Sequence, residues 1–381
     1  MRTLRRHSVR RRGGFQPPCC PNPRCRFHRP DPQWRFIRFG FFRRPSDQRR
    51  IQTFRCAHCH RRFSTQTFSH TYWLRHRHLP LPVATLVTEG AALRQIARSL
   101  HTSHSTVIRL VARLGRHCLL FHTALLHGHP LREPLVIDGF ESFEFSQFFP
   151  FHANLAVGAD SWLLYDFTDS PLRRKGAMRP DQRARRALLE RQFGRPDPKA
   201  VETGIDALLT AVLTRHLPAG TLELHSDDHP AYRRALRRVR ARPQLRTRIR
   251  HHITASTLRR TCRNPLFPVN LADLLLRHAS ANHRRETIAF SKRRQAALER
   301  LALFTVWRNT IKRRRENGPP TTAAMEIGVT PTPLTWRDVF RKRLFPRHHD
   351  LSRAWRQYYW RRVKTAAYGA GQTAHRCRYA F

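Results

Sequence analysis

The chain has 381 residues, and its 73 Lys and Arg against 25 Asp and Glu give a formal net charge of +48. A surplus of this size requires a polyanionic partner, because self-repulsion otherwise opposes the compact state. Hydrophobic residues make up 40% of the chain, which excludes a purely disordered basic protein and predicts a real core. No run reaches the roughly 18 apolar residues that a membrane helix needs, so we expect no membrane span.

The first residues of the chain do not have the pattern of a secretory signal. Residues 1–14 are basic, but Pro and Cys follow them where a signal peptide has an apolar segment. Five of the 8 cysteines lie before residue 60. Clustered cysteines in such a chain favour a bound metal over disulfides, so we expect a reducing, cytoplasmic compartment.

Residues 1–80 are expected to form a small metal-binding module with a basic arm. Its cysteines form two close pairs, Cys20 with Cys25 and Cys56 with Cys59. Zn²⁺ takes four soft ligands in a tetrahedron, and two tight turns that each offer a pair of thiolates provide that geometry. This module resembles a zinc ribbon with one structural zinc ion.

The residues around the two cysteine pairs support a ribbon and leave some ligands open. Residues 34–38 and 50–55 have the composition of strands. Cys19 could replace Cys20 as a ligand, and His58 or His60 could also substitute, although we favour the four cysteines named above.

Residues 81–125 show apolar side chains at spacings of three and four, which predicts helices. The segment Leu93–Leu100, a short turn and a second helix capped by Ser105 have the form of a helix-turn-helix. Arg109, Arg113 and Arg116 would then project from the second helix toward double-stranded DNA. Such patterns also occur in ordinary helical hairpins, and no base preference can be derived from them.

Residues 131–315 alternate short β-rich runs with helical stretches, which is typical of an α/β domain. The expected strands include Leu135–Ile137, Leu155–Val157, Trp162–Phe167 and Leu222–Leu224, and the expected helices include Lys199–His216 and Ala231–Val239. We expect residues 169–198 to be a basic excursion between a strand and a helix. Beyond them, residues 316–381 form a basic, aromatic C-terminal tail.

Two aspartates are expected at the ends of apolar strands in this domain. Asp138 follows Leu135–Ile137 and precedes Gly139, which would let the chain open out, and Asp227 follows the strand at Leu222–Leu224. Two carboxylates at strand ends can share hard divalent ions, which prefer oxygen ligands. In a two-metal site, one ion activates the attacking oxygen and the other stabilises the leaving oxygen of a phosphodiester. Strand-terminal aspartates are also common turn formers.

The order of a zinc ribbon, a helix-turn-helix and a paired-Asp α/β domain resembles that of bacterial DDE-type insertion-sequence transposases. The stretches that carry the resemblance are 136–143, 225–232, 263–273, 284–292 and 307–309. The resemblance implies a ribonuclease-H-like fold, with a mixed sheet and helices, and metal-dependent DNA cleavage and strand transfer.

The resemblance also suggests which carboxylates would hold the magnesium ions. The family's first two aspartates correspond to Asp138 and Asp227, with Asp228 as the alternate for the second. The family expects a glutamate as the third member, and this sequence has none at the matching helix start. We favour Asp273, with Asn270 and Glu286 as alternates.

Arg277 and the aromatic residues of the tail are also assigned roles. Arg277 lies four residues beyond Asp273 on the same helical face and is expected to contact DNA. The aromatic residues of the tail are expected to pack on the catalytic domain rather than to stack on bases. They are Trp355, Tyr358, Tyr359 and Trp360.

The resulting hypothesis is a transposase that binds the ends of an insertion sequence and transfers DNA strands. It would use two Mg²⁺ or Mn²⁺ ions and act as a homo-oligomer on element ends and target DNA, associated with the bacterial nucleoid. The alternative is a catalytically inactive, transposase-derived DNA-binding protein or regulator whose carboxylate triad is broken at Asn270.

Overall fold

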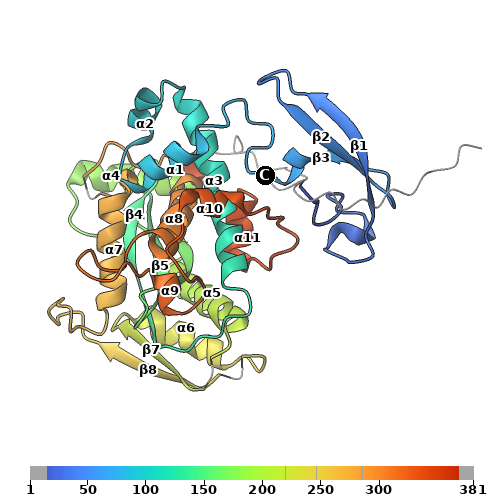
Figure 1. Ribbon diagram of the computed structural model, residues 1–381. Helices are drawn as coiled ribbons and strands as arrows, with labels where there is room; N and C mark the ends of the chain where they lie inside the picture. The colour runs from blue at the N-terminus through green and yellow to red at the C-terminus, as the bar shows by residue number, and fades with distance from the viewer. Residues whose placement is uncertain (1–14, 219, 246, 285, 369–381) are drawn as a thin grey trace, which may run out of the picture.

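A mixed five-stranded sheet forms the centre of the protein in a computed structural model, which describes residues 15–218, 220–245, 247–284 and 286–368 (Figure 1). Its strands are β4 (Leu135–Phe143), β5 (Pro150–Gly158), β6 (Leu164–Pro171), β7 (Leu222–Asp227) and β8 (Ile249–Thr254). The strand order is β6-β5-β4-β7-β8. Strands β4, β5 and β6 are antiparallel neighbours, whereas β7 runs parallel to both β4 and β8. The expected α/β class is confirmed.

Helices cover both faces of this sheet because successive side chains of each strand point to opposite sides. On β4, Val136 and Phe140 belong to the core that includes the long helices α3, α7 and α8. Leu135 and Ile137 belong to the second core, with α5 and α6. The helices are α3 (His104–Leu125), α5 (Ala200–Arg215), α6 (Pro230–Arg240), α7 (Phe267–Ala279) and α8 (Arg294–Val306), which continues as a π-helical turn at Trp307–Ile311.

The N-terminal part is a small antiparallel sheet that stands beside the main body (Figure 1). It has the order β1-β2-β3, with β1 (Phe36–Arg43), β2 (Arg50–Cys56) and β3 (Arg62–Ser64). Short 3₁₀ turns lie at Arg26–His28 and Thr65–Phe68. Its core is aromatic, since Phe54, Phe63 and Phe68 are all buried there. The strands expected at 34–38 and 50–55 are therefore present, shifted by two residues at the start of the first.

Three helices follow this small sheet. They are α1 (Pro80–Thr88), α2 (Leu93–Ser99) and α3. Ser103, and not Ser105 as expected, caps α3: its side chain accepts a hydrogen bond from the backbone N–H of Thr106. The two helices of the predicted helix-turn-helix are thus present, and α3 extends for 22 residues into the core of the main body.

The segment expected as a basic excursion contains a helix of its own, α4 (Pro180–Phe193). The sequence did not predict this helix because it lacks an apolar face: only Leu189 of its fourteen residues is buried. Two arginines fasten it to the sheet side. Arg173 forms an ion pair with Glu190 at 2.7 Å, and Arg186 donates to the backbone carbonyl of Arg174 at 3.0 Å.

The C-terminal segment packs into the same core as α3 and α8. It contains α9 (Ala323–Glu326), α10 (Trp336–Arg341), α11 (Arg353–Tyr359) and a 3₁₀ turn at Ala366–Tyr368. Trp355, Tyr358 and Tyr359 are buried, whereas Trp360 is half-buried. The expectation that these rings supply buried area agrees with this packing. Phe345 of the same segment packs against Phe68, so the C-terminal segment also contacts the small N-terminal sheet.

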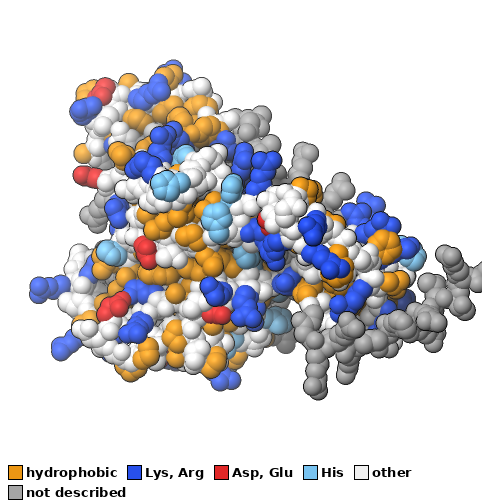
Figure 2. Space-filling view, turned by 45° about the horizontal axis from the view of Figure 1, so that its top comes forward, with side chains coloured by type: hydrophobic (Ala, Val, Ile, Leu, Met, Phe, Trp, Pro, Cys, Tyr) orange, Lys and Arg blue, Asp and Glu red, His pale blue; other side chains and the backbone are white. Residues whose placement is uncertain are grey.

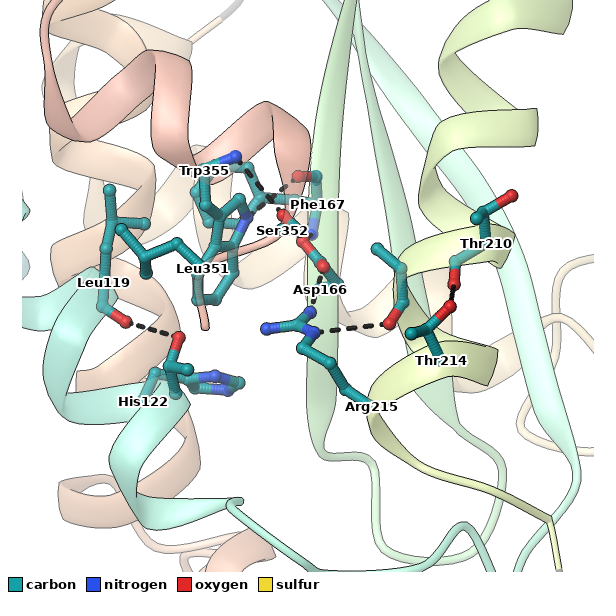
Figure 3. Close-up of polar contacts among 12 residues, drawn as sticks. Leu119, His122, Asp166, Phe167, Thr210, Thr214, Arg215, Leu351, Ser352 and Trp355 are labelled. Carbon is teal, nitrogen blue, oxygen red and sulfur yellow. Dashed lines mark hydrogen bonds and ion pairs between the residues drawn. The ribbon is translucent and has the colours of Figure 1, made fainter. Parts of the chain in front are cut away.

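A buried polar cluster fixes the C-terminal segment to the sheet (Figure 3). Asp166 on β6 forms an ion pair with Arg215 on α5, and the Arg215 guanidinium lies 5.3 Å from the ring of Trp355. The indole N–H of Trp355 donates to the carbonyl of Phe167 at 3.0 Å. Burial outweighs the charge of Arg215 and raises the pKa of Asp166 to about 6. These contacts join β6, α5 and α11 at one point.

None of the described helices combines the length and the apolar character that crossing a membrane requires.

Candidate active site and metal centre

The two cysteine pairs of the N-terminal sheet converge on one point. The Sγ atoms of Cys20, Cys25, Cys56 and Cys59 all lie within 4.8 Å of one another. Each pair lies in a tight turn. The backbone N–H of Cys25 donates to the carbonyl of Asn22 at 3.0 Å in one turn. In the other, Cys56 ends β2 and Cys59 follows three residues later.

The chemistry of these four thiols fits a structural zinc ion. Burial raises the pKa of Cys20, whereas hydrogen bonds from the Trp34 indole and the backbone N–H groups of Cys59 and His58 outweigh burial and lower the pKa of Cys56 to about 7. Four sulfur atoms at this spacing are a closed, all-thiolate ligand set of the kind that Zn²⁺ takes in structural sites.

The alternates to these ligands point elsewhere. Cys19 is buried, and its Sγ lies 3.9 Å from the Nε2 atom of His348 in the C-terminal segment. The His58 ring packs against Phe27 with 5.4 Å between the ring centroids. His60 is exposed. The structure therefore brings together the four favoured cysteines and leaves these three residues outside the cluster.

The three arginines expected to face DNA from α3 differ in their surroundings. Arg109 is exposed. Arg113 is half-buried, and its guanidinium donates to the carbonyls of His70 and Tyr72 at 2.9 and 2.5 Å. Arg116 is 6% exposed. The prediction that all three project outward is wrong for Arg116, because this part of α3 faces the interior of the protein. Arg113 binds the loop that contains His70 and Tyr72.

Asp138 and Asp227 lie side by side on adjacent parallel strands. The register pairs Leu135 with Leu224 and Val136 with His225. Continued by two residues, this register brings Asp138 of β4 level with Asp227 of β7, and residues that are level on neighbouring strands point to the same face. The sequence had suggested that Asp138 lies at the end of its strand. In the structure it lies within β4.

Gly139 has a different role from the one expected. The chain does not open out there, because β4 continues to Phe143. A Cβ atom at residue 139 would lie 1.9 Å from the backbone oxygen of Ala153 on β5, so only glycine permits this close approach of the two strands.

The third aspartate approaches from helix α7. Asp273 is close enough to Asp138 for their charges to interact: burial and the charge of Asp138 raise the pKa of Asp273 well above its usual value. Burial and the charge of Asp227 likewise raise the pKa of Asp138. The Oδ1 atom of Asp273 is buried without a hydrogen-bond partner among the described residues. Arg277 and Arg260 oppose this rise at Asp273 without cancelling it, so the carboxylates form a group whose mutual repulsion is only partly compensated.

This group fits divalent cations by its donor set. Carboxylate oxygens are the ligands that Mg²⁺ prefers, and an unpartnered buried carboxylate oxygen needs a cation or a proton. Among the described residues, only the four cysteines form a group of three or more such side chains whose ligand atoms converge closely enough for one metal ion, so the three carboxylates are not gathered around a single ion position. A pair of ions can span a wider set of ligands than a single ion.

The alternates for the second and third carboxylate have other surroundings. Asp228 is exposed and accepts hydrogen bonds from the backbone and hydroxyl of Ser256 at 3.4 and 3.3 Å. Glu286 is exposed in a bend that precedes α8. Asn270 lies on α7, three residues before Asp273, and is half-buried.

Arg277 lies one turn beyond Asp273 on α7. Its guanidinium is 5.5 Å from the ring of Phe140 and donates to the carbonyl of His283 at 3.2 Å. Its charge lowers the pKa of Asp273, although burial dominates. The side chain therefore borders the carboxylate group and is half-buried.

Tyr232 is a residue of this site to which the sequence assigned no role. It lies in the first turn of α6, five residues after Asp227, and is 3% exposed. Its hydroxyl donates to Oδ1 of Asp138 at 3.1 Å. Burial and the charges of all three aspartates raise its pKa, so the hydroxyl stays protonated and remains a donor. Its position in the sequence could have identified it, because a helix that starts shortly after Asp227 places its first turn beside that residue.

Comparisons with known proteins add little to this geometry. No protein-family model and no curated protein matches the chain. A solved structure of a simian T-cell lymphotropic virus intasome in complex with PP2A regulatory subunit B56 gamma contains a similar chain. The identity is 13%, the match covers 66% of this chain and 74% of that chain, and the TM-score is 0.25. So low a TM-score carries no argument about fold or function.

Proposed function

We propose that the protein is a DNA transposase of the DDE type, with three aspartates as its carboxylate triad. The observation that carries the proposal is the convergence of three aspartates, Asp138, Asp227 and Asp273: burial and a neighbouring aspartate raise the pKa of Asp138 and of Asp273, and Oδ1 of Asp273 is buried without a hydrogen-bond partner among the described residues. Such clusters of perturbed acids occur preferentially at functional sites.

The strand arrangement supports the same proposal. A sheet with three antiparallel strands followed by two strands parallel to the first, in the order β6-β5-β4-β7-β8, is the arrangement expected of a ribonuclease-H-like fold. In that fold the first and fourth strands, here β4 and β7, are neighbours and offer their acids to one site. Asp273 on α7 would take the place of the family's glutamate.

In this proposal the aspartates bind the divalent ions, and neighbouring side chains orient the aspartates or contact the DNA. Bound Mg²⁺ or Mn²⁺ would activate the attacking oxygen and stabilise the leaving oxygen of the phosphodiester. Tyr232 would keep one oxygen of Asp138 engaged, so that the other faces the ions. Arg277 would offer positive charge to a DNA phosphate beside Asp273.

The charge of the chain supports DNA as the partner. The face drawn in Figure 2 carries many Lys and Arg side chains and few acidic ones, over both the small sheet and the main body. Exposed Arg109, near the start of α3, would contribute to binding element ends, together with the zinc ribbon. Assembly of several copies on the DNA ends belongs to the same proposal.

A plasmid-nicking assay tests the proposal. The wild-type protein should convert supercoiled DNA to open circles in Mg²⁺ or Mn²⁺ but not in EDTA. Asp138→Asn and Asp227→Asn should each abolish nicking and leave DNA binding intact, because an amide supplies only a neutral oxygen to a hard cation. Inactivity of the wild type in every metal, with intact DNA binding, would favour an inactive DNA-binding relative of the transposases.

A further inference from the structure

Strand β1 of the small N-terminal sheet exposes a row of apolar side chains to solvent. The exposed fractions are 50% for Ile37, 39% for Phe39, 53% for Phe41 and 43% for Phe42. The aromatic residues of the same sheet that form its core, such as Phe54 and Phe63, are buried. The exposed side chains of β1 are therefore not part of the core. Single exposed apolar residues are common on protein surfaces, but four within six positions form a patch that needs an explanation.

Arginines from the neighbouring strands cover these rings. The guanidinium carbon of Arg50, on β2, lies 4.0 Å from the centroid of the Phe41 ring. That of Arg62, on β3, lies 4.1 Å from the Phe39 ring. Register pairs Ile37 with Arg55 and Arg55 with Arg62, so a row across the sheet presents one apolar and two cationic side chains. The surface thus combines aromatic rings with fixed positive charge.

The charge of this part of the chain selects the class of partner. Between Cys20 and Ser64 the sequence has 12 Arg and two Asp, a net charge of +10. A second copy of the same surface would be repelled. The register shift between Arg38 and Phe41, with Gly40 at a φ of +91°, also interrupts the edge along which a second sheet would pair. A polyanion is the complementary partner.

We propose that β1 and its flanking arginines, Arg50, Arg55 and Arg62, form a binding surface for single-stranded DNA. Phenylalanine rings can stack on bases only when the bases are not already stacked inside a duplex, and this combination of rings and cations is typical of single-strand surfaces. Because β1 is an edge strand of the sheet, single-stranded DNA can run along it and reach the rings on both faces of the strand. Orange and blue side chains adjoin on this part of the protein in Figure 2.

This inference rests on the nucleic-acid part of the proposed function and is independent of its chemistry. The surface belongs to the small N-terminal sheet, whereas the carboxylates lie on β4, β7 and α7. Unpaired DNA arises wherever strands are cut and separated at an element end, so the surface would hold the strand that cleavage releases.

The test is a pair of titrations of the full-length protein by fluorescence anisotropy. The probes are a labelled oligothymidine and a labelled duplex with the same number of phosphates. The variant Phe39→Ala/Phe41→Ala should weaken binding of oligothymidine by at least about 10-fold, because it removes two rings on which bases can stack. Its affinity for the duplex should change less than about 2-fold, because the arginines that contact phosphates remain.

The matched control is Phe145→Ala, which removes a ring that is also 39% exposed but lies outside the small sheet. It should leave both affinities unchanged. Zinc content per chain should equal that of the wild type in each variant, which shows that the ribbon is still folded. Equal losses on both probes, an unchanged affinity for oligothymidine, or the same loss in Phe145→Ala would each overturn the proposal. A wild type that does not nick plasmid, together with a selective loss of oligothymidine affinity in Phe39→Ala/Phe41→Ala, would contradict the proposed chemistry and support this surface.

Discussion

Replacing Asp138 by Asn should stabilise the metal-free protein. Asp138 and Asp227 are level on adjacent parallel strands, which are about 4.8 Å apart. Two unit charges about 5 Å apart at an effective dielectric constant of about 20 repel by about 3 kcal/mol. Both residues are partly exposed, so solvent screening reduces the gain to about 1–2 kcal/mol. We therefore expect the Tm without metal to rise by about 2–6 °C.

Metal should reverse this order. Mg²⁺ at 100 times its Kd stabilises the wild type by about 2.7 kcal/mol, whereas the variant lacks one ligand and gains less. The assay is thermal unfolding of both proteins in EDTA and in saturating Mg²⁺. Glu141→Gln is the control: it changes the net charge equally on the same strand, but at an exposed position. A lower Tm of Asp138→Asn in EDTA, or an equal gain from Mg²⁺ in both proteins, would refute the reasoning.

Four further predictions follow from individual side chains. Cys56→Ser should lower the zinc content per chain measured by atomic absorption, and undiminished zinc would eliminate the ribbon. Arg109→Ala should reduce the preference for element-end DNA in competition binding, while an equal loss for every sequence would make it a phosphate contact only. Tyr232→Phe should weaken Mg²⁺ binding by about 10-fold in calorimetry, with an unaltered affinity arguing against its bond to Asp138. Because the pKa of Asp166 is about 6 in the fold against an ordinary 3.8, the native state binds the proton more tightly. The free energy of unfolding of the wild type should therefore rise relative to Asp166→Asn as the pH falls from 7 to 4 in urea titrations, and a fall would show that the ion pair with Arg215 outweighs burial.

The sequence predicted the elements whose signals are local. The spacing within the two cysteine pairs predicted the ligand cluster, because each pair lies in a tight turn whose geometry depends only on neighbouring residues. The apolar runs that lead to Asp138 and Asp227 predicted two strands, which are neighbours in the sheet, whereas Asp273 was proposed from the family resemblance and its role stays a prediction. These features depend on residue type and on the periodicity of a single element.

The features that the sequence missed depend on contacts between distant segments. Arg116 is buried because the later part of α3 enters the core with α8, which no pattern within α3 reveals. Tyr232 meets Asp138 across 94 positions of the chain. Helix α4 has one buried residue and therefore lacks an apolar stripe.

Strand transfer by variants of the third carboxylate tests most directly whether Asp138, Asp227 and Asp273 form one catalytic site. The measurement is the Mg²⁺-dependent joining of labelled DNA ends, taken from the flanks of the coding region, to a target plasmid. Our account predicts that Asp273→Asn reduces joining to the level of Asp138→Asn, that Asn270→Ala keeps part of the activity, and that Glu286→Gln keeps all of it. Full joining by Asp273→Asn, or its loss only in Glu286→Gln, would contradict the account.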